Sequence, residues 1–118
     1  MGLPEFRHLD VAQAIDITGD EESARMVIET AIESLTDAMG RLDAAIVGCA
    51  APDGYAVLHA LKGALPIYAR SDLVSHVTDV EQTKHGDVPA DIFERMRGVH
   101  AEISVLLGEV RTFVASPA

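Results

Sequence analysis

Tryptophan is absent from this sequence, and phenylalanine and tyrosine together supply only five of the 118 residues. Hydrophobic residues still make up 48% of the chain, so Leu, Ile, Val, Met and Ala must build its core. Such a core suits packed helices better than a β-sandwich, whose strands favour aromatic and β-branched side chains. The length is that of one domain, and we expect residues 1–118 to form a single helical unit.

Positive charge is also scarce. Nine Lys and Arg residues stand against 19 Asp and Glu residues, and the formal net charge is −10. Nucleic-acid phosphates and anionic membrane surfaces attract basic proteins, so we expect neither nucleic acid nor membrane as a partner. An acidic surface keeps a small protein soluble and steers it toward basic patches on other proteins.

Cysteine occurs once, at Cys49, so the chain cannot form an intrachain disulfide. A single cysteine fits the reducing cytoplasm, and no His or Lys lies close to Cys49 in sequence to activate its thiol. Long hydrophobic runs are lacking as well. The longest, residues 44–51, is too short to span a bilayer, and the first ten residues lack the apolar region of a secretory signal. We therefore expect a cytoplasmic protein.

Four short stretches rich in Gly, Pro, Asp and Ser interrupt the hydrophobic pattern, and each predicts a break between helices. They are Gly19-Asp20, Ala51-Pro52-Asp53-Gly54, Ser71-Asp72 and Gly86-Asp87-Val88-Pro89. Between them apolar residues recur every three or four positions, which predicts helices over about 10–18, 21–48, 73–80 and 90–114, in addition to the helix that carries residues 55–70. No segment alternates with period two for long enough to predict a strand. The expected fold is all-α, an antiparallel four-helix bundle with a short additional N-terminal helix.

A helical wheel over residues 55–70 separates apolar positions from polar ones. One arc would face the core, and it carries Val57, Leu58, Leu61, Ala64, Leu65 and Tyr68. The opposite arc is polar or small, and it carries His59, Lys62, Gly63 and Pro66, with Arg70 four residues further on. The wheel therefore predicts that His59 points to solvent, with Lys62 one turn away on the same face.

Together, His59, Lys62 and Gly63 suit one kind of chemistry. A solvated neutral imidazole is a competent nucleophile near neutral pH, and a neighbouring ammonium stabilises a phosphoryl group that arrives on it. Glycine costs a helix roughly 1 kcal/mol against alanine, but a bare backbone lets a flat partner surface reach the ring. The three residues predict a phosphoryl acceptor that works by docking. The alternative is a chance cluster on an exposed helix face, which this spacing would produce in roughly one chain in a hundred.

The stretch His59-Ala60-Leu61-Lys62-Gly63 resembles the His-x-x-Lys-Gly signature of the histidine-containing phosphotransfer (HPt) domains of phosphorelays. The resemblance extends along most of the chain. Residues 9–35 (LDVAQAIDITGDEESARMVIETAIESL) are similar to the family's N-terminal helix, Gly-Asp turn and first long helix. Residues 71–82 (SDLVSHVTDVEQ) are similar to the helix that follows the phosphohistidine helix.

This resemblance implies a phosphorelay intermediate. His59 would accept a phosphoryl group from the phosphoaspartate of a receiver domain and pass it to another receiver, with Lys62 in an electrostatic role and Gly63 in a steric one. Family members have no kinase activity of their own. No cofactor is expected, because the Mg²⁺ of such transfers belongs to the receiver. The implied partners are response-regulator receiver domains, with a hybrid histidine kinase as a further candidate, and the expected state is a monomer.

Two alternatives stay open. The chain could be the phosphoacceptor domain of a chemotaxis-type histidine kinase, or a helical adaptor that docks a receiver without accepting phosphate. The sequence also departs from the family after Gly63, where Pro66 lacks an N–H. We therefore expect a helix kink one turn past His59, on the docking face.

Glu81, on the next predicted helix, could fold back and bond the Nδ1 of His59, which would leave Nε2 as the nucleophile. In the related phosphoacceptor domains of chemotaxis kinases an acidic residue at this separation looks similar, but an acidic residue near a helix end is more commonly just solvated. The remaining histidines, His8, His76, His85 and His100, do not predict a metal site. Glu5-x-x-His8 has the spacing of a bundle metal-ligand pair, but no second pair accompanies it.

Overall fold

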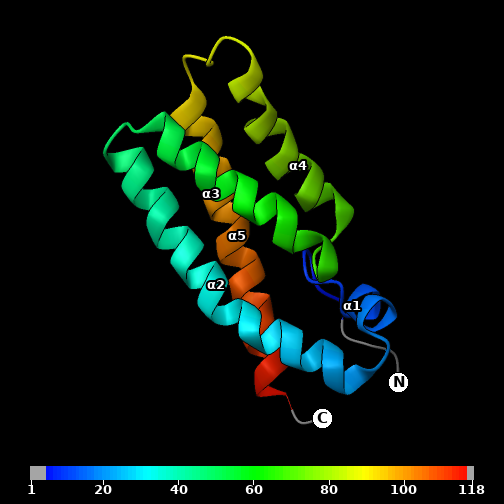
Figure 1. Ribbon diagram of the computed structural model, residues 1–118. Helices are drawn as coiled ribbons and strands as arrows, with labels where there is room; N and C mark the ends of the chain where they lie inside the picture. Colours follow the sequence, from blue (N-terminus) through cyan, green and yellow to red (C-terminus); the bar gives the residue numbers. More distant parts are fainter. Residues whose placement is uncertain (1–4, 117–118) are drawn as a thin grey trace.

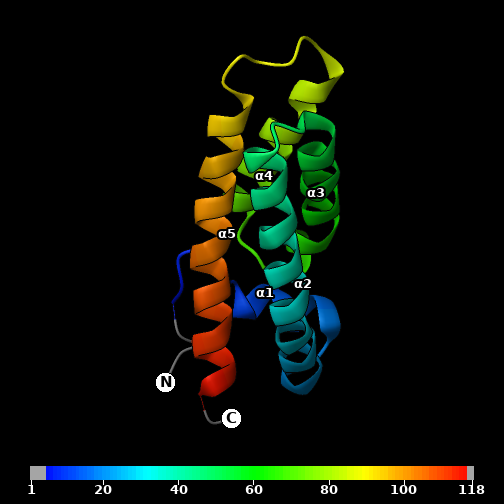
Figure 2. The ribbon, with the colours of Figure 1, turned by 90° about the vertical axis from the view of Figure 1, so that its left-hand side faces the viewer.

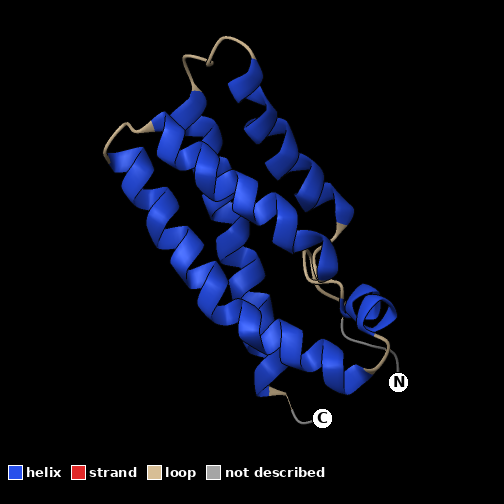
Figure 3. Ribbon diagram, in the orientation of Figure 1, coloured by secondary structure: helices blue, strands red, loops and turns tan. Residues whose placement is uncertain are grey.

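The computed structural model describes residues 5–116, so the ends of the expected domain, residues 1–4 and 117–118, lie outside it. Helices dominate the described part, which contains no strand, and the all-α prediction is confirmed (Figure 3). The helices are α1 (Val11–Thr18), α2 (Glu21–Val47), α3 (Ala51–Ala64), α4 (Ser71–Gln82) and α5 (Ile92–Ala115). Two short 3₁₀ turns, η1 (Leu65–Ile67) and η2 (Thr83–His85), follow α3 and α4.

The four longer helices lie side by side and reverse direction from one to the next (Figure 1). α2 packs against α3 and α5, and α4 packs against the same two helices. The short α1 lies across the end of the molecule that is remote from the α4–α5 connection (Figures 1 and 2). The result is an elongated body of 47 × 22 × 19 Å.

The core follows the apolar spacing of the sequence. Its fully buried side chains include Ile28, Leu35 and Leu42 of α2, Leu58 of α3, Val77 of α4, and Met96, Ile103 and Leu106 of α5. Burying one such side chain contributes about 1.5–3 kcal/mol. The helices are therefore held together mainly by these interhelical stripes.

The Gly19-Asp20 break works as predicted. Gly19 has a φ of +102°, a left-handed conformation that favours glycine, and its N–H donates to the carbonyl of Ile15 to end α1. Asp20 then caps α2, because its carboxylate accepts from the backbone N–H of Ser23 at 2.7 Å. This hydrogen bond lowers the pKa of Asp20.

The predicted break at residues 51–54 is wrong. α2 ends at Val47, the turn occupies residues 48–50, and Ala51–Gly54 form the first turn of α3. Pro52 fits there because the first helical turn has no intrahelical acceptor for its missing N–H. Gly54 is buried, and a Cβ on it would lie 2.5 Å from Sδ of Met96 and 3.7 Å from Cβ of Ala45. Glycine here lets α3 approach α5 and α2 closely.

The other end of this segment also differs from the wheel. In the last α-type hydrogen bond of α3, the N–H of Leu65 donates to the carbonyl of Leu61. The 3₁₀ turn η1 follows, because Pro66 has no N–H with which to continue the helical hydrogen bonds. The expected kink is thus a helix end. Leu65 and Tyr68 are buried as predicted, whereas Ala64 is exposed rather than part of the core.

Arg70 is not on the outward face of α3, since it directly precedes α4. Its Nε donates to the carbonyl of Phe6 at 3.0 Å, and its backbone N–H donates to the carbonyl of His8 at 2.7 Å. The N-terminal segment is therefore bound to the η1–α4 connection. On the other side, the Glu109 carboxylate of α5 accepts from the amides of Arg7, His8 and Leu9. Among residues 5–116, no helix is both long and apolar enough to cross a membrane.

Candidate functional site

The outward face of α3 carries the three residues singled out from the sequence. The His59 side chain is 68% exposed and that of Lys62 is 35% exposed. Apart from its chain neighbours and the backbone of its own helix, no described atom lies within 4 Å of the position that a Cβ on Gly63 would take. Leu58 and Leu61 are buried behind them and hold α3 against the core. An imidazole, an ammonium and a bare backbone therefore share one accessible surface.

Glu81 meets this face from the end of α4. Its side chain is only 1% exposed, and its Oε1 lies 3.1 Å from Nδ1 of His59. The carboxylate is therefore buried beside the imidazole, not solvated as acidic residues near helix ends usually are. A carboxylate at Nδ1 favours the tautomer that keeps its proton there and donates it to Glu81. The lone pair of Nε2 is then free for nucleophilic attack.

Two lysines surround the same carboxylate oxygen. Nζ of Lys84, from η2, lies 2.8 Å from Oε1 of Glu81, and Nζ of Lys62 lies 3.9 Å from it. The hydrogen bond from Lys84 is the main reason why the pKa of Glu81 is lowered to about 2. The hydrogen bond with His59 and the charge of Lys62 act in the same direction, whereas burial opposes them. Glu81 is therefore ionised at neutral pH.

Sequence reasoning missed Lys84. The available signal was its position three residues after Glu81, a spacing at which opposite charges meet on a helical turn. That signal would have identified a pair of charges but not its place beside His59. The place depends on how α4 packs against α3.

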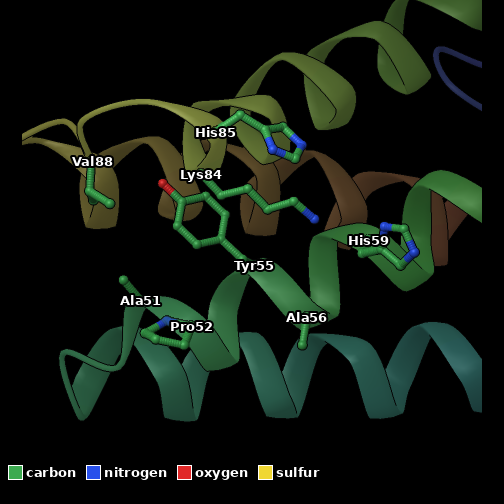
Figure 4. Close-up of a pocket in the computed structure, with 8 residues that line it drawn as sticks. All are labelled: Ala51, Pro52, Tyr55, Ala56, His59, Lys84, His85 and Val88. Atoms are coloured by element: carbon green, nitrogen blue, oxygen red, sulfur yellow. The ribbon is translucent and has the colours of Figure 1, made fainter.

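An open, mostly apolar groove of about 740 Å³ leads away from His59 (Figure 4). It is lined by Ala51, Pro52, Tyr55, Ala56, His59, Lys84, His85 and Val88. Figure 4 shows His59 at one end of this set and Val88 at the other. The Tyr55 hydroxyl bonds the Thr83 hydroxyl at 2.7 Å and so ties α3 to η2 beneath the groove. An exposed apolar surface therefore lies next to the imidazole.

The other residues weighed in the sequence lie elsewhere. His76 contacts Glu102 at 2.8 Å, and His100 is half-buried. His8 is buried and neither ring nitrogen has a hydrogen-bond partner in the described structure. Within residues 5–116, no three side chains of His, Cys, Asp or Glu gather as a metal site would require. Cys49 is exposed in the α2–α3 turn.

No family model, curated protein or solved structure matches the chain. The residues around His59 and their geometry are therefore the features of the chain that bear on its function. Chemically, the arrangement offers an accessible imidazole nitrogen, an ionised carboxylate on the opposite side of the ring, and two ammonium groups within reach. Such groups can stabilise negative charge that reaches the ring, and the groove beside His59 is open to solvent.

Proposed function

We propose that the protein is an HPt-type histidine phosphotransfer protein, built as an antiparallel four-helix bundle with an additional N-terminal helix, and acting in the cytoplasm. His59 would take a phosphoryl group from the phosphoaspartate of one receiver domain and give it to another. The observation that carries the proposal is an exposed imidazole whose Nδ1 contacts a buried, ionised carboxylate. This contact orients the ring and leaves Nε2 free to react with a group that arrives at the surface.

In the proposed transfer step, one bond to phosphorus forms as another breaks. The Nε2 lone pair forms the new N–P bond while the P–O bond to the receiver's aspartate breaks, and that carboxylate leaves with the electron pair. The imidazole keeps its Nδ1 proton and gains positive charge, which the Glu81 carboxylate at 3.1 Å offsets. Lys62 lies one turn from His59 and lowers the energy of the negative phosphoryl oxygens. Reversal of the same step passes the group to a second receiver.

The surface around His59 suits a docking partner. Gly63 leaves the backbone bare beside the ring, and Pro66 in η1 marks where the outward face of α3 ends. A receiver brings its own Mg²⁺ and its acidic phosphorylation site to this face. We propose that Gly63 permits the close approach that in-line attack by His59 requires.

A second candidate is favoured by the contact between Glu81 and His59, because an acidic residue similarly placed is a feature of the phosphoacceptor domains of chemotaxis-type kinases. In that role the donor would be ATP, delivered by a separate kinase domain. A third, an adaptor that only docks receivers, would leave His59 unmodified.

One experiment separates these functions. The protein is incubated with a phosphorylated receiver and, separately, with a histidine kinase and ATP, and acid-labile, alkali-stable label is measured. Label from a receiver that disappears in His59→Gln supports the relay, and label from the kinase alone supports the second candidate. Receiver binding without any label supports the adaptor and overturns the proposal.

A further inference from the structure

Both lysines of the chain converge on one atom. The sequence contains only two lysines, Lys62 and Lys84. They come from different elements, α3 and η2, yet the amines of both lie within 4 Å of Oε1 of Glu81. In a chain with a formal net charge of −10, this places two of nine cationic side chains beside the most exposed part of the site.

A phosphoryl group that arrives on His59 meets an electrostatic problem. The Glu81 carboxylate, which holds Nδ1, is negative and repels the negative phosphoryl oxygens. Lys62 alone would bring the local charge to zero, and Lys84 makes it positive by one. Lys84 therefore supplies the charge that makes approach of an anion favourable next to a buried carboxylate.

Lys84 also has the freedom to bind a second ligand. An ammonium has three donors, and among the described residues the Nζ of Lys84 makes one hydrogen bond, to Glu81. Its side chain is 32% exposed, and its amine end points from η2 toward His59 (Figure 4). The flexible stem allows the amine to leave the carboxylate and turn toward the oxygens of a group carried on Nε2.

We propose that Lys84 and Lys62 form a two-cation site for phosphoryl oxygens, in which Lys84 exchanges Glu81 for the phosphoryl group once His59 carries it. The proposal rests on the proposed function and deepens it. Glu81 retains the Nδ1–H of His59 and the charge of Lys62 after the exchange, so it is not left as an unpaired buried charge. Lys84 is then a phosphoryl-binding residue as well as the residue that keeps Glu81 ionised.

The first test measures phosphorylation of His59 without any protein partner. Phosphoramidate is the probe: its P–N bond breaks and releases ammonia as the new bond to imidazole nitrogen forms. We expect Lys84→Met to slow labelling about three- to tenfold and Lys84→Arg to restore most of the rate. The matched control is Arg41→Met, which removes one charge from an exposed ion pair within α2. It should leave the rate within about a factor of two.

The second test observes the lysines directly. With two lysines, the side-chain Hε–Cε NMR signals can be assigned with Lys62→Arg and Lys84→Arg variants. Phosphorylation of His59 should move the Lys84 signal, and the same reagent should not move it in His59→Gln. A normal labelling rate in Lys84→Met, or an unmoved Lys84 signal in the phosphorylated protein, would overturn only the proposed role of Lys84 and would leave His59 as the nucleophile. Absence of any label on His59 overturns the nucleophile and this inference together.

Discussion

At the scale of single residues, the candidate site combines a buried charge with an exposed imidazole. His59 is accessible, whereas Glu81, which contacts its Nδ1, is almost fully covered. Burial alone would favour the neutral acid, but hydrogen bonds from Lys84 and His59 lower the pKa of Glu81 to about 2. The carboxylate thus keeps the charge that orients the imidazole throughout the neutral range.

The lowered pKa of Glu81 predicts how stability changes with pH. The pKa is about 2 in the folded protein and 4.5 in the unfolded reference, so ionised Glu81 stabilises the fold above about pH 4.5. This contribution should disappear as the pH falls from about 5 toward 2. Urea unfolding of the wild type and Glu81→Gln at several pH values checks it, because the gap between their unfolding free energies should narrow over that window. Glu94→Gln, an exposed acid of α5, is the control. A gap that stays constant down to pH 2 would contradict the prediction.

A larger side chain at Gly63 should stabilise the fold but weaken the binding of a receiver. No neighbour lies where its Cβ would be, so Gly63→Leu should keep the fold and raise the unfolding free energy by about 0.5–1 kcal/mol. Under the proposed function, the same side chain would hold a receiver away from His59, and the affinity should fall about tenfold or more, or 1.4 kcal/mol. Gly40→Leu is the matched control, because Gly40 is also helical and free of neighbours, but on α2. Equal receiver affinity in the two variants would remove Gly63 from the docking surface.

At the scale of elements, both ends of α3 are determined by proline and by close packing. Pro52 starts the helix inside the stretch that reads as a break, and Pro66 ends it before the wheel does. The helix that carries His59 is consequently only 14 residues long. The opposite side of α3 packs against α2 and α4, and at Gly54 its backbone lies close to the side chain of Met96.

Gly54→Ala should therefore destabilise the protein, although alanine favours helices. The added Cβ would lie 2.5 Å from Sδ of Met96, so this fully buried side chain would have to shift within the core. We expect a loss of about 1–3 kcal/mol of unfolding free energy, measured by denaturant unfolding. Shortening Met96 in a Gly54→Ala, Met96→Val double variant should cost less than the sum of the two single changes. Strict additivity would show that the two sites do not interact.

At the scale of the whole molecule, residues 7–10 are bound to two segments far along the chain. The N-terminal segment bonds the η1–α4 connection through Asp10 N–H to the carbonyl of Tyr68 at 2.8 Å. Its preceding amides are satisfied by Glu109, about one hundred residues away in sequence. These contacts fasten α1 across the end of the helices, remote from the α4–α5 connection (Figure 2).

Loss of the hydrogen bonds from the N-terminal segment to Glu109 should lower the stability of the protein. Glu109→Ala leaves the amides of Arg7, His8 and Leu9 without their acceptor, which should lower the unfolding free energy by about 1–3 kcal/mol. Hydrogen exchange at His8 and Leu9 should accelerate at the same time. Glu94→Ala, which removes an exposed pair with Arg97 on the same helix, should change stability by less than about 1 kcal/mol. Unaltered exchange in Glu109→Ala would mean that other contacts hold the segment.

The sequence by itself determined the helices and the outward position of His59, because both follow from spacing within a few residues. Apolar positions three and four apart gave α2 and α5 to within about two residues, and the same rule separated His59 from buried Leu58 and Leu61. Local rules were insufficient where packing decides, as at residues 51–54, since a Pro-Asp-Gly stretch is compatible with a turn or with a first helical turn.

Only the tertiary structure decided what surrounds the imidazole. Glu81 is 22 residues from His59 in sequence, and its contact depends on how α3 and α4 pack. The convergence of Lys62 and Lys84 on that carboxylate arises in the same way. No local pattern encodes such contacts, because they are fixed by the burial of apolar stripes far along the chain. The periodicity placed a histidine on the surface, and the packing of its neighbours gave it a charged environment.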